Sequence, residues 1–199
     1  KAIKIILITL LVLVGVSLLI DYIEGRKNVT NNGDKEVNYK FYDPDFEENI
    51  FQNKEYLELY NDGYMDFKEG SVTLGITKDI AYKYGEDTKL MIDMLHTIIN
   101  GDNDAYNRCF SATYFESHDP KNEFTMQMLY NIKIERHSSE KVELDDAPDY
   151  TRSIFSVEYK IYHNNGTFRK DIGEGSRKQY FTITNQSGQW LIEAITSVG

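Results

Sequence analysis

Tyrosine is the residue type in this sequence with the most scope for chemistry, because its hydroxyl can donate a proton or bind a small molecule. The chain contains 15 tyrosines among 199 residues. Several lie in segments whose apolar pattern predicts a helix or a strand. A tyrosine ring also fills a core while its hydroxyl reaches water, and we favour this role over catalysis. The candidate pocket or core residues are Tyr106, Phe110, Tyr114, Tyr130, Tyr159, Tyr180 and Trp190.

The other reactive side chains form no recognisable catalytic or metal-binding set. The histidines lack the spacing of metal ligands, and the acidic turn from Asp145 to Asp149 contains Pro148 and lacks the pattern of a calcium-binding loop. Cys109 falls on the apolar side of a short predicted helix, which favours a buried, unreactive thiol. We therefore predict no catalytic residue, no metal site and no cofactor. The four histidines are His96, His118, His137 and His163.

Helices are predicted in the middle of the chain. Asp43-Pro44 is a typical helix start, and the helix that it opens would end at Asn61-Asp62-Gly63. The main helix covers about residues 88–100, and an earlier start near Lys78 is the alternative. Asn100-Gly101-Asp102 ends this helix and caps a second, short one that extends to Phe110. Asp119-Pro120 predicts a third helix, which would carry Phe124, Met128 and Leu129.

Strands are predicted mainly in the last third of the chain. Residues 72–76 alternate in polarity and could pair with residues 64–69 across Gly70. From about residue 131 the apolar period changes to two, with strands expected around residues 132–134, 155–161, 181–183 and 190–198. Helices followed by long strands and tight turns predict an α+β fold, with helices packed on one face of a curved antiparallel sheet.

This arrangement resembles the nuclear transport factor 2-like superfamily. The resemblance rests on the helix over residues 90–99, the break at Asn100-Gly101-Asp102, the short helix over 105–110, and then Ser111 and Tyr114-Phe115. The closing hairpin of residues 180–184 and 190–195 adds to it. The resemblance covers about residues 78–199 and implies a cone formed by sheet and helices. Enzymes of this superfamily, such as ketosteroid isomerase and scytalone dehydratase, place an Asp, Tyr or His inside the cone. Other members are binding modules or assembly subunits, so the fold alone does not decide function.

The N-terminal part of the chain reads as a membrane segment. Residues 5–20, IILITLLVLVGVSLLI, form an uncharged apolar run, and they predict a transmembrane anchor over residues 1–23. A cleaved signal peptide would need an Ala-x-Ala-like site, and a core helix would need a polar face. Lys1 and Lys4 predict a cytoplasmic N-terminus and an extracytoplasmic C-terminal domain at the cell membrane. Residues 24–40 read as a polar stalk, residues 41–77 as a helix and short strands without an assigned role, and residues 78–199 as the nuclear transport factor 2-like domain.

Composition narrows the set of partners. The formal net charge of −10 disfavours direct nucleic-acid binding, because an acidic surface repels the phosphate backbone. A single cysteine excludes an internal disulfide, which for an exported domain favours a host such as a Gram-positive bacterium.

The predicted architecture of one span, a stalk and one outer domain resembles the bitopic membrane subunits of conjugative type IV secretion systems, which are not enzymes. We therefore predict a non-enzymatic single-pass membrane protein whose exported domain contacts other envelope or secretion-machine proteins, and also forms homo-oligomers. The alternative is a membrane-tethered enzyme or small-ligand binder that uses the interior of the cone. A vacant apolar cavity of about 300 Å³ or more with a few polar groups would favour the alternative, and a filled cone would favour the scaffold.

Overall fold

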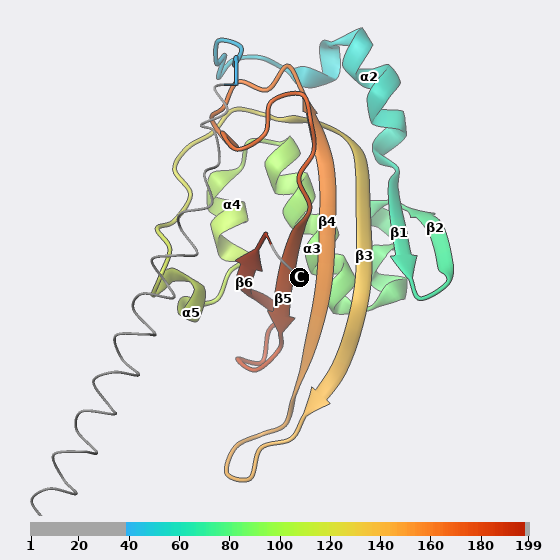
Figure 1. The fold of residues 1–199 in the computed structure, drawn as a ribbon, viewed down its shortest axis with the longest axis vertical. Coiled ribbons are helices and arrows are strands. Elements are labelled where there is room, and N and C mark those ends of the chain that lie inside the picture. Colours follow the sequence, from blue (N-terminus) through green and yellow to red (C-terminus); the bar gives the residue numbers. More distant parts are fainter. Residues whose placement is uncertain (1–38, 198–199) are drawn as a thin grey trace, which may run out of the picture. The chain divides into compact units, whose positions relative to one another are not determined.

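A computed structural model describes residues 39–197 of the chain, which form an α+β fold around one mixed sheet. Figure 1 shows the long strands β3 and β4 beside α3, with the β1–β2 hairpin at one edge of the sheet. The helices are α2 (Lys54–Tyr60), α3 (Glu86–Ile99), α4 (Asn103–Arg108) and α5 (Ala112–Phe115), and the short 3₁₀ segments are Ile50–Gln52, Asn61–Gly63 and Lys78–Tyr84. The strands are β1 (Met65–Glu69), β2 (Val72–Ile76), β3 (Met128–Val142), β4 (Tyr150–Tyr162), β5 (Gln179–Thr184) and β6 (Leu191–Thr196).

The strand order in the sheet is β2-β1-β3-β4-β5-β6. β1 pairs with β3 in parallel, with Phe67 opposite Ile134, and the other neighbouring strands are antiparallel. The prediction of a wholly antiparallel sheet is therefore wrong. A parallel pair needs a long crossover, and residues 77–127, which contain α3, α4 and α5, supply it. Residues 41–77, which the sequence left without a role, thus add the first two strands to the same sheet.

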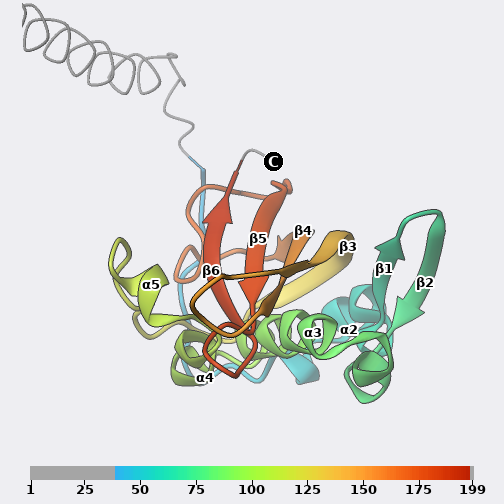
Figure 2. The same cartoon turned by 90° about the horizontal axis from the view of Figure 1, so that it is seen from below.

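The core lies between α3 and the inner face of the sheet. Figure 2 shows α3 and α4 on the same side of β4, β5 and β6. Leu95 is fully buried, and Ile98, Phe110, Tyr159 and Phe181 join the same buried cluster, as the apolar stripes predict. The alternation of β4 explains its burial, since Phe155, Val157, Tyr159 and Ile161 face the core. The residues between them lie on the outer face of the sheet and are half-buried, except Ser156, which is buried there.

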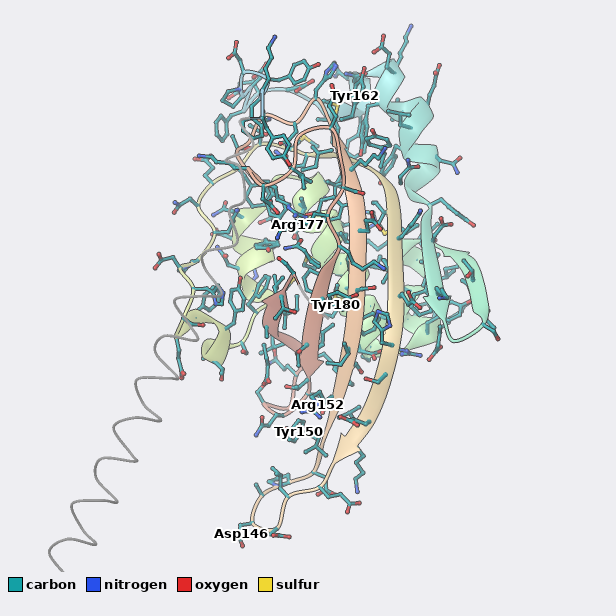
Figure 3. All side chains as sticks on the ribbon, in the orientation of Figure 1. Asp146, Tyr150, Arg152, Tyr162, Arg177 and Tyr180 are labelled. Carbon is teal, nitrogen blue, oxygen red and sulfur yellow. The ribbon has the colours of Figure 1, made fainter. Side chains whose placement is uncertain are left out.

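β3 and β4 extend beyond the rest of the sheet as a long hairpin. Figure 3 shows Asp146 at the tip of this hairpin and Tyr162 at the opposite end of β4. Near the tip, Lys141 Nζ lies 2.6 Å from an oxygen of Asp149, and the Asp149 side chain also accepts a hydrogen bond from Leu144 N. The acidic turn is therefore closed by its own ion pair.

Two predicted helices are absent from the positions expected. The first helix begins at Lys54, not at Pro44, because the side chain of Asn53 caps it by accepting a hydrogen bond from Tyr56 N. No helix follows Asp119-Pro120. The helix found nearby is α5, which is capped by Ser111, and Met128 and Leu129 begin β3. Phe124 still enters the core, but from an extended segment.

The prediction of a membrane-spanning helix in this fold is also corrected. No helix within residues 39–197 is long and apolar enough to cross a membrane. The apolar run at residues 5–20, together with most of the polar segment at residues 24–40, lies outside the described residues.

A candidate ligand-binding cavity

A cavity of about 680 Å³ opens to solvent where α3, α4 and α5 meet the inner ends of β4, β5 and β6. Its apolar lining comes from Met94 and Ile98 of α3, Phe168 of the β4–β5 connection, Phe181 of β5 and Ile195 of β6. Polar and aromatic side chains surround this lining, and the principal ones are Tyr106, Asn107, Tyr114, His118, Lys121, Tyr159, Thr167, Arg169, Lys170, Asp171 and Gln179.

The helical wall of the cavity is positioned by two caps. Asp102 starts α4 by accepting a hydrogen bond from Ala105 N at 2.8 Å, and Ser111 starts α5 by accepting one from Tyr114 N at 3.2 Å. The first cap directs the ring of Tyr106 against Phe168, with the ring centroids 5.4 Å apart. The Phe110 ring packs against Tyr106 and Tyr114, with ring centroids 4.9 Å and 4.5 Å apart, respectively. The two short helices therefore present a continuous aromatic wall.

The opposite wall carries a buried guanidinium. Arg169 is 7 % exposed, and it donates to Asp171 through Nε at 2.8 Å and Nη2 at 2.5 Å. Its Nη1 donates to Gln179 Oε1 at 2.9 Å, and its Cζ lies 5.5 Å from the centre of the Tyr159 ring. Arg169 lowers the pKa of the Asp171 carboxyl, so this acid stays ionised. The charge of Arg169 is thus largely balanced by Asp171.

Lys121 is a second cation in the cavity lining, and it has a different environment. Its ammonium donates to the backbone carbonyl of Phe168 at 2.5 Å and lies 4.9 Å from the Phe168 ring centroid. No carboxylate of the described residues lies within ion-pair distance of it. Burial is the main reason that its pKa is lowered, and the nearby Arg169 adds to the effect.

The phenols of the cavity are hydrogen-bond donors at neutral pH. Burial raises the pKa of Tyr106 well above its usual value, and it also raises the pKa of Tyr159 and Tyr114. Burial raises the pKa of the nearby Cys109 thiol to about 11, so this thiol is protonated and weakly nucleophilic. The cavity therefore offers phenol donors and three cationic side chains, Lys121, Arg169 and Lys170, to a ligand. Of the two carboxylates among its described lining residues, Asp171 is engaged by Arg169, and the other is Asp119.

The rim of the cavity is held by the N-terminal end of the described chain. Tyr42 N donates to Asn164 O at 3.0 Å, and the Tyr42 ring stacks on His163 at 4.3 Å. Phe41 lies against Gly166, where φ is +73° and an added Cβ would come within 3.1 Å of the Phe41 ring. The side chain of Asn164 binds this loop internally, by donating to Ile172 O at 2.7 Å. The connection that carries Arg169 is thus fixed from both sides.

The structure brings together some of the candidate residues and separates others. Tyr106, Tyr114 and Tyr159 line the cavity, and Phe110 supports the first two from behind. Tyr130 and Tyr180 lie instead on the outer face of the sheet. Tyr130 of β3 is opposite Lys160 of β4. The Tyr180 ring centroid is 5.7 Å from that of His137, and Figure 3 labels Tyr180 on β5. Trp190 is half-buried against the core just before β6.

Sequence reasoning missed Lys121 and Arg169. Lys121 lay in the segment predicted to begin the third helix, and Arg169 in a connection without a role assigned from the sequence. One sequence signal could have indicated Arg169. Arg169 is followed two residues later by the oppositely charged Asp171, and both come shortly after the turn Asn164-Asn165-Gly166. The histidines do not converge, and no cluster of metal-ligating side chains occurs among the residues that the structure describes.

Comparison with models of known protein families gives no match for this chain, and comparison with curated proteins gives none either.

Proposed function

We propose that this protein binds a small organic molecule in the cavity between α3–α5 and the inner face of β4–β6. The observation that carries the proposal is the volume of about 680 Å³, which exceeds the threshold of roughly 300 Å³ for a ligand pocket. The lining combines an apolar floor with a larger set of polar and charged side chains, so it is more polar than a typical ligand pocket and suits a ligand that carries a polar group. A cavity of this size favours the ligand binder over the scaffold, because a scaffold does not require one.

Binding without catalysis is the form of the proposal that the chemistry supports. The cavity phenols are held neutral, Asp171 is held ionised by Arg169, and the Cys109 thiol is held protonated. A general base needs a pKa near neutrality, and these groups are displaced from it. The cavity phenols therefore suit recognition of a ligand as donors that stay neutral, and Lys121, whose pKa burial lowers, lines the same cavity.

A neutral fluorescent dye, N-phenyl-1-naphthylamine, tests the proposal with the purified full chain. We expect its emission to rise on binding, and we expect Ile195→Trp to abolish this increase because the larger ring fills the cavity. Ala194→Trp is the matched control, since Ala194 is the preceding residue of β6 and pairs with Thr182 on the outer face. Equal dye binding by wild type and Ile195→Trp, with both proteins folded, would contradict the proposal.

The second candidate is the predicted contact module of an envelope assembly, with conjugative transfer as its most specific form. The observation in its favour is a series of exposed large apolar side chains in one stretch of sequence: Tyr42, Phe46, Phe51, Leu57, Leu59 and Tyr64. A photo-crosslinking residue at position 57 should capture a protein partner in intact cells, whereas one at Ser187 should not. Equal labelling at both positions would argue against this role.

A further inference from the structure

Arg169 and Lys121 are the buried and the half-buried cation of the cavity lining, whereas Lys170 is exposed. Arg169 and Lys121 are not equivalent, and their difference indicates the charge of the ligand. Arg169 already has a carboxylate partner in Asp171 and a second acceptor in Gln179. Lys121 has one carbonyl acceptor and two further ammonium protons, and no described carboxylate is within 4 Å of it. A half-buried ammonium without a counter-ion is costly, so an anionic ligand group there would replace lost solvation.

The aromatic ring beside Lys121 connects this charge to the rest of the cavity. The Phe168 ring contacts the Lys121 ammonium on one side, and the ring of Tyr106 packs edge-on against it at 5.4 Å. The Tyr106 hydroxyl has no hydrogen-bond acceptor among the described residues, although its neighbours include Tyr159, Tyr114 and Arg169. The Lys121 ammonium and the Tyr106 side chain, whose hydroxyl is free to donate, therefore both contact the Phe168 ring. The apolar residues of the lining lie in the same cavity.

We propose that the ligand is an amphipathic organic anion, with a single carboxylate or a similar acidic group at Lys121 and Tyr106 and an apolar body against Met94, Phe181 and Ile195. This inference rests on the proposed function and gives it a substrate class. An aliphatic or aromatic monocarboxylic acid has the required chemistry. A dianion such as a phosphate monoester fits less well, because Asp171 lies beside Arg169 in the same lining.

Two dyes with the same ring system separate the anion inference from ligand binding itself. 8-Anilinonaphthalene-1-sulfonate carries one negative charge, and N-phenyl-1-naphthylamine is its uncharged counterpart. We expect Lys121→Gln to weaken binding of the sulfonate by a factor about ten or more times larger than that by which it changes binding of the neutral dye. Lys121→Arg should preserve most of the affinity for the sulfonate, because the positive charge remains.

Lys160→Gln is the matched control for this experiment. Lys160 is also half-buried and lies near an aromatic ring, 6.0 Å from the Tyr130 centroid, but it belongs to the outer face of the sheet. Its substitution should change neither affinity. Ile195→Trp should abolish binding of both dyes, which assigns the signal to the cavity.

A competition measurement on the wild-type chain avoids any dependence on how the variants fold. Dodecanoate should displace the neutral dye at concentrations at least about tenfold lower than dodecanol does. If the neutral dye binds in the cavity but the acid and the alcohol compete equally, the anion inference is wrong and the proposed function stands. If Lys121→Gln weakens both dyes equally, Lys121 only shapes the cavity, and the inference is again wrong. If neither dye binds, both the inference and the proposed function fail.

Discussion

Arg136 is the residue on which the buried charge at the start of α3 depends. Its Nη1 donates to the two carboxylate oxygens of Asp87 at 3.1 and 3.2 Å, and its Nη2 donates to Glu69 at 2.6 Å. The Asp87 carboxylate also accepts hydrogen bonds from Ser153 Oγ at 2.7 Å and from Thr88 N at 2.8 Å. The side chains of Arg136 and Asp87 are 14 % and 5 % exposed. The Arg136–Asp87 pair and its hydrogen bonds therefore join β3, β4 and α3 through charges that water cannot easily reach, and the half-exposed Glu69 links β1 to them.

We expect Arg136→Ala to lower the free energy of unfolding by about 3–5 kcal/mol, because it leaves the Asp87 carboxylate buried without its counter-ion. Arg152→Ala is the control, since Arg152 pairs with Glu140 while both side chains are about half exposed. That change should cost less than about 1 kcal/mol. Urea unfolding of the full chain measures both. A similar small loss for the two variants would show that Asp87 finds enough other partners.

At the scale of elements, the junction between α3 and α4 decides where the cavity tyrosines point. Gly101 has φ +69°, and a Cβ there would lie 2.8 Å from Met126 N and 3.0 Å from the Thr125 carbonyl carbon. The backbone of residues 124–126 therefore passes directly over this turn. The turn can be tight only because glycine allows both the left-handed conformation and the close approach.

Gly101→Ala should destabilise the protein by about 2–4 kcal/mol, which combines the left-handed strain with the forced displacement of a packed backbone. Gly188→Ala separates the two effects. Gly188 has φ +84°, but nothing lies within 4 Å of its Cβ position, so its cost should be about 1–2 kcal/mol. Thermal and urea unfolding give the comparison. Equal losses at the two glycines would mean that residues 124–126 move aside without cost.

The sequence predicted α3 and α4 well, because the apolar stripe of α3 and the turn Asn100-Gly101-Asp102 are local signals. It failed for residues 119–129, where Asp119-Pro120 has the local chemistry of a helix start. The structure uses those residues otherwise, since Asn107 binds Lys121 through its side chain and Phe124 packs on Tyr106 and Phe168. These contacts come from elements far along the chain, and no local pattern contains them. The same reason explains why Tyr106, Tyr114 and Tyr159 could be proposed for a pocket but Lys121 and Arg169 could not.

At the scale of the whole molecule, several carboxylates tie the fold to pH. The pKa of Asp171 is lowered mainly by Arg169, that of Glu135 mainly by Lys68, and that of Asp149 mainly by Lys141. A carboxyl with a lowered folded-state pKa stabilises the protein above its unfolded pKa, and this contribution is lost as the pH falls through the folded value. The unfolded values are about 3.9 for Asp and 4.3 for Glu.

We therefore expect Asp171→Asn to lower the thermal midpoint at pH 7. The effect should diminish as the pH falls below the unfolded value of about 3.9 and toward the lower folded pKa of the wild-type carboxyl. Thermal unfolding of both proteins between pH 7 and pH 3 tests this. Glu174→Gln is a suitable control, because Glu174 is exposed on the same connection and belongs to no ion pair among residues 39–197. A difference between wild type and Asp171→Asn that persists unchanged at pH 3 would show that the carboxylate acts by shape, not by charge.

The parallel pairing of β1 with β3 has a consequence for synthesis of the chain. Lys68 and Glu135, which pair across these strands at 2.6 Å, are 67 residues apart in sequence. A ribosome adds about 5–20 residues per second, so the β1–β2 hairpin emerges roughly 3–13 s before β3 is available to it. During that interval the inner edge of β1 has unpaired backbone groups, which are a template for pairing with another chain. The alternating charges of Asp66, Lys68 and Glu69 along this short strand reduce that hazard until β3 arrives.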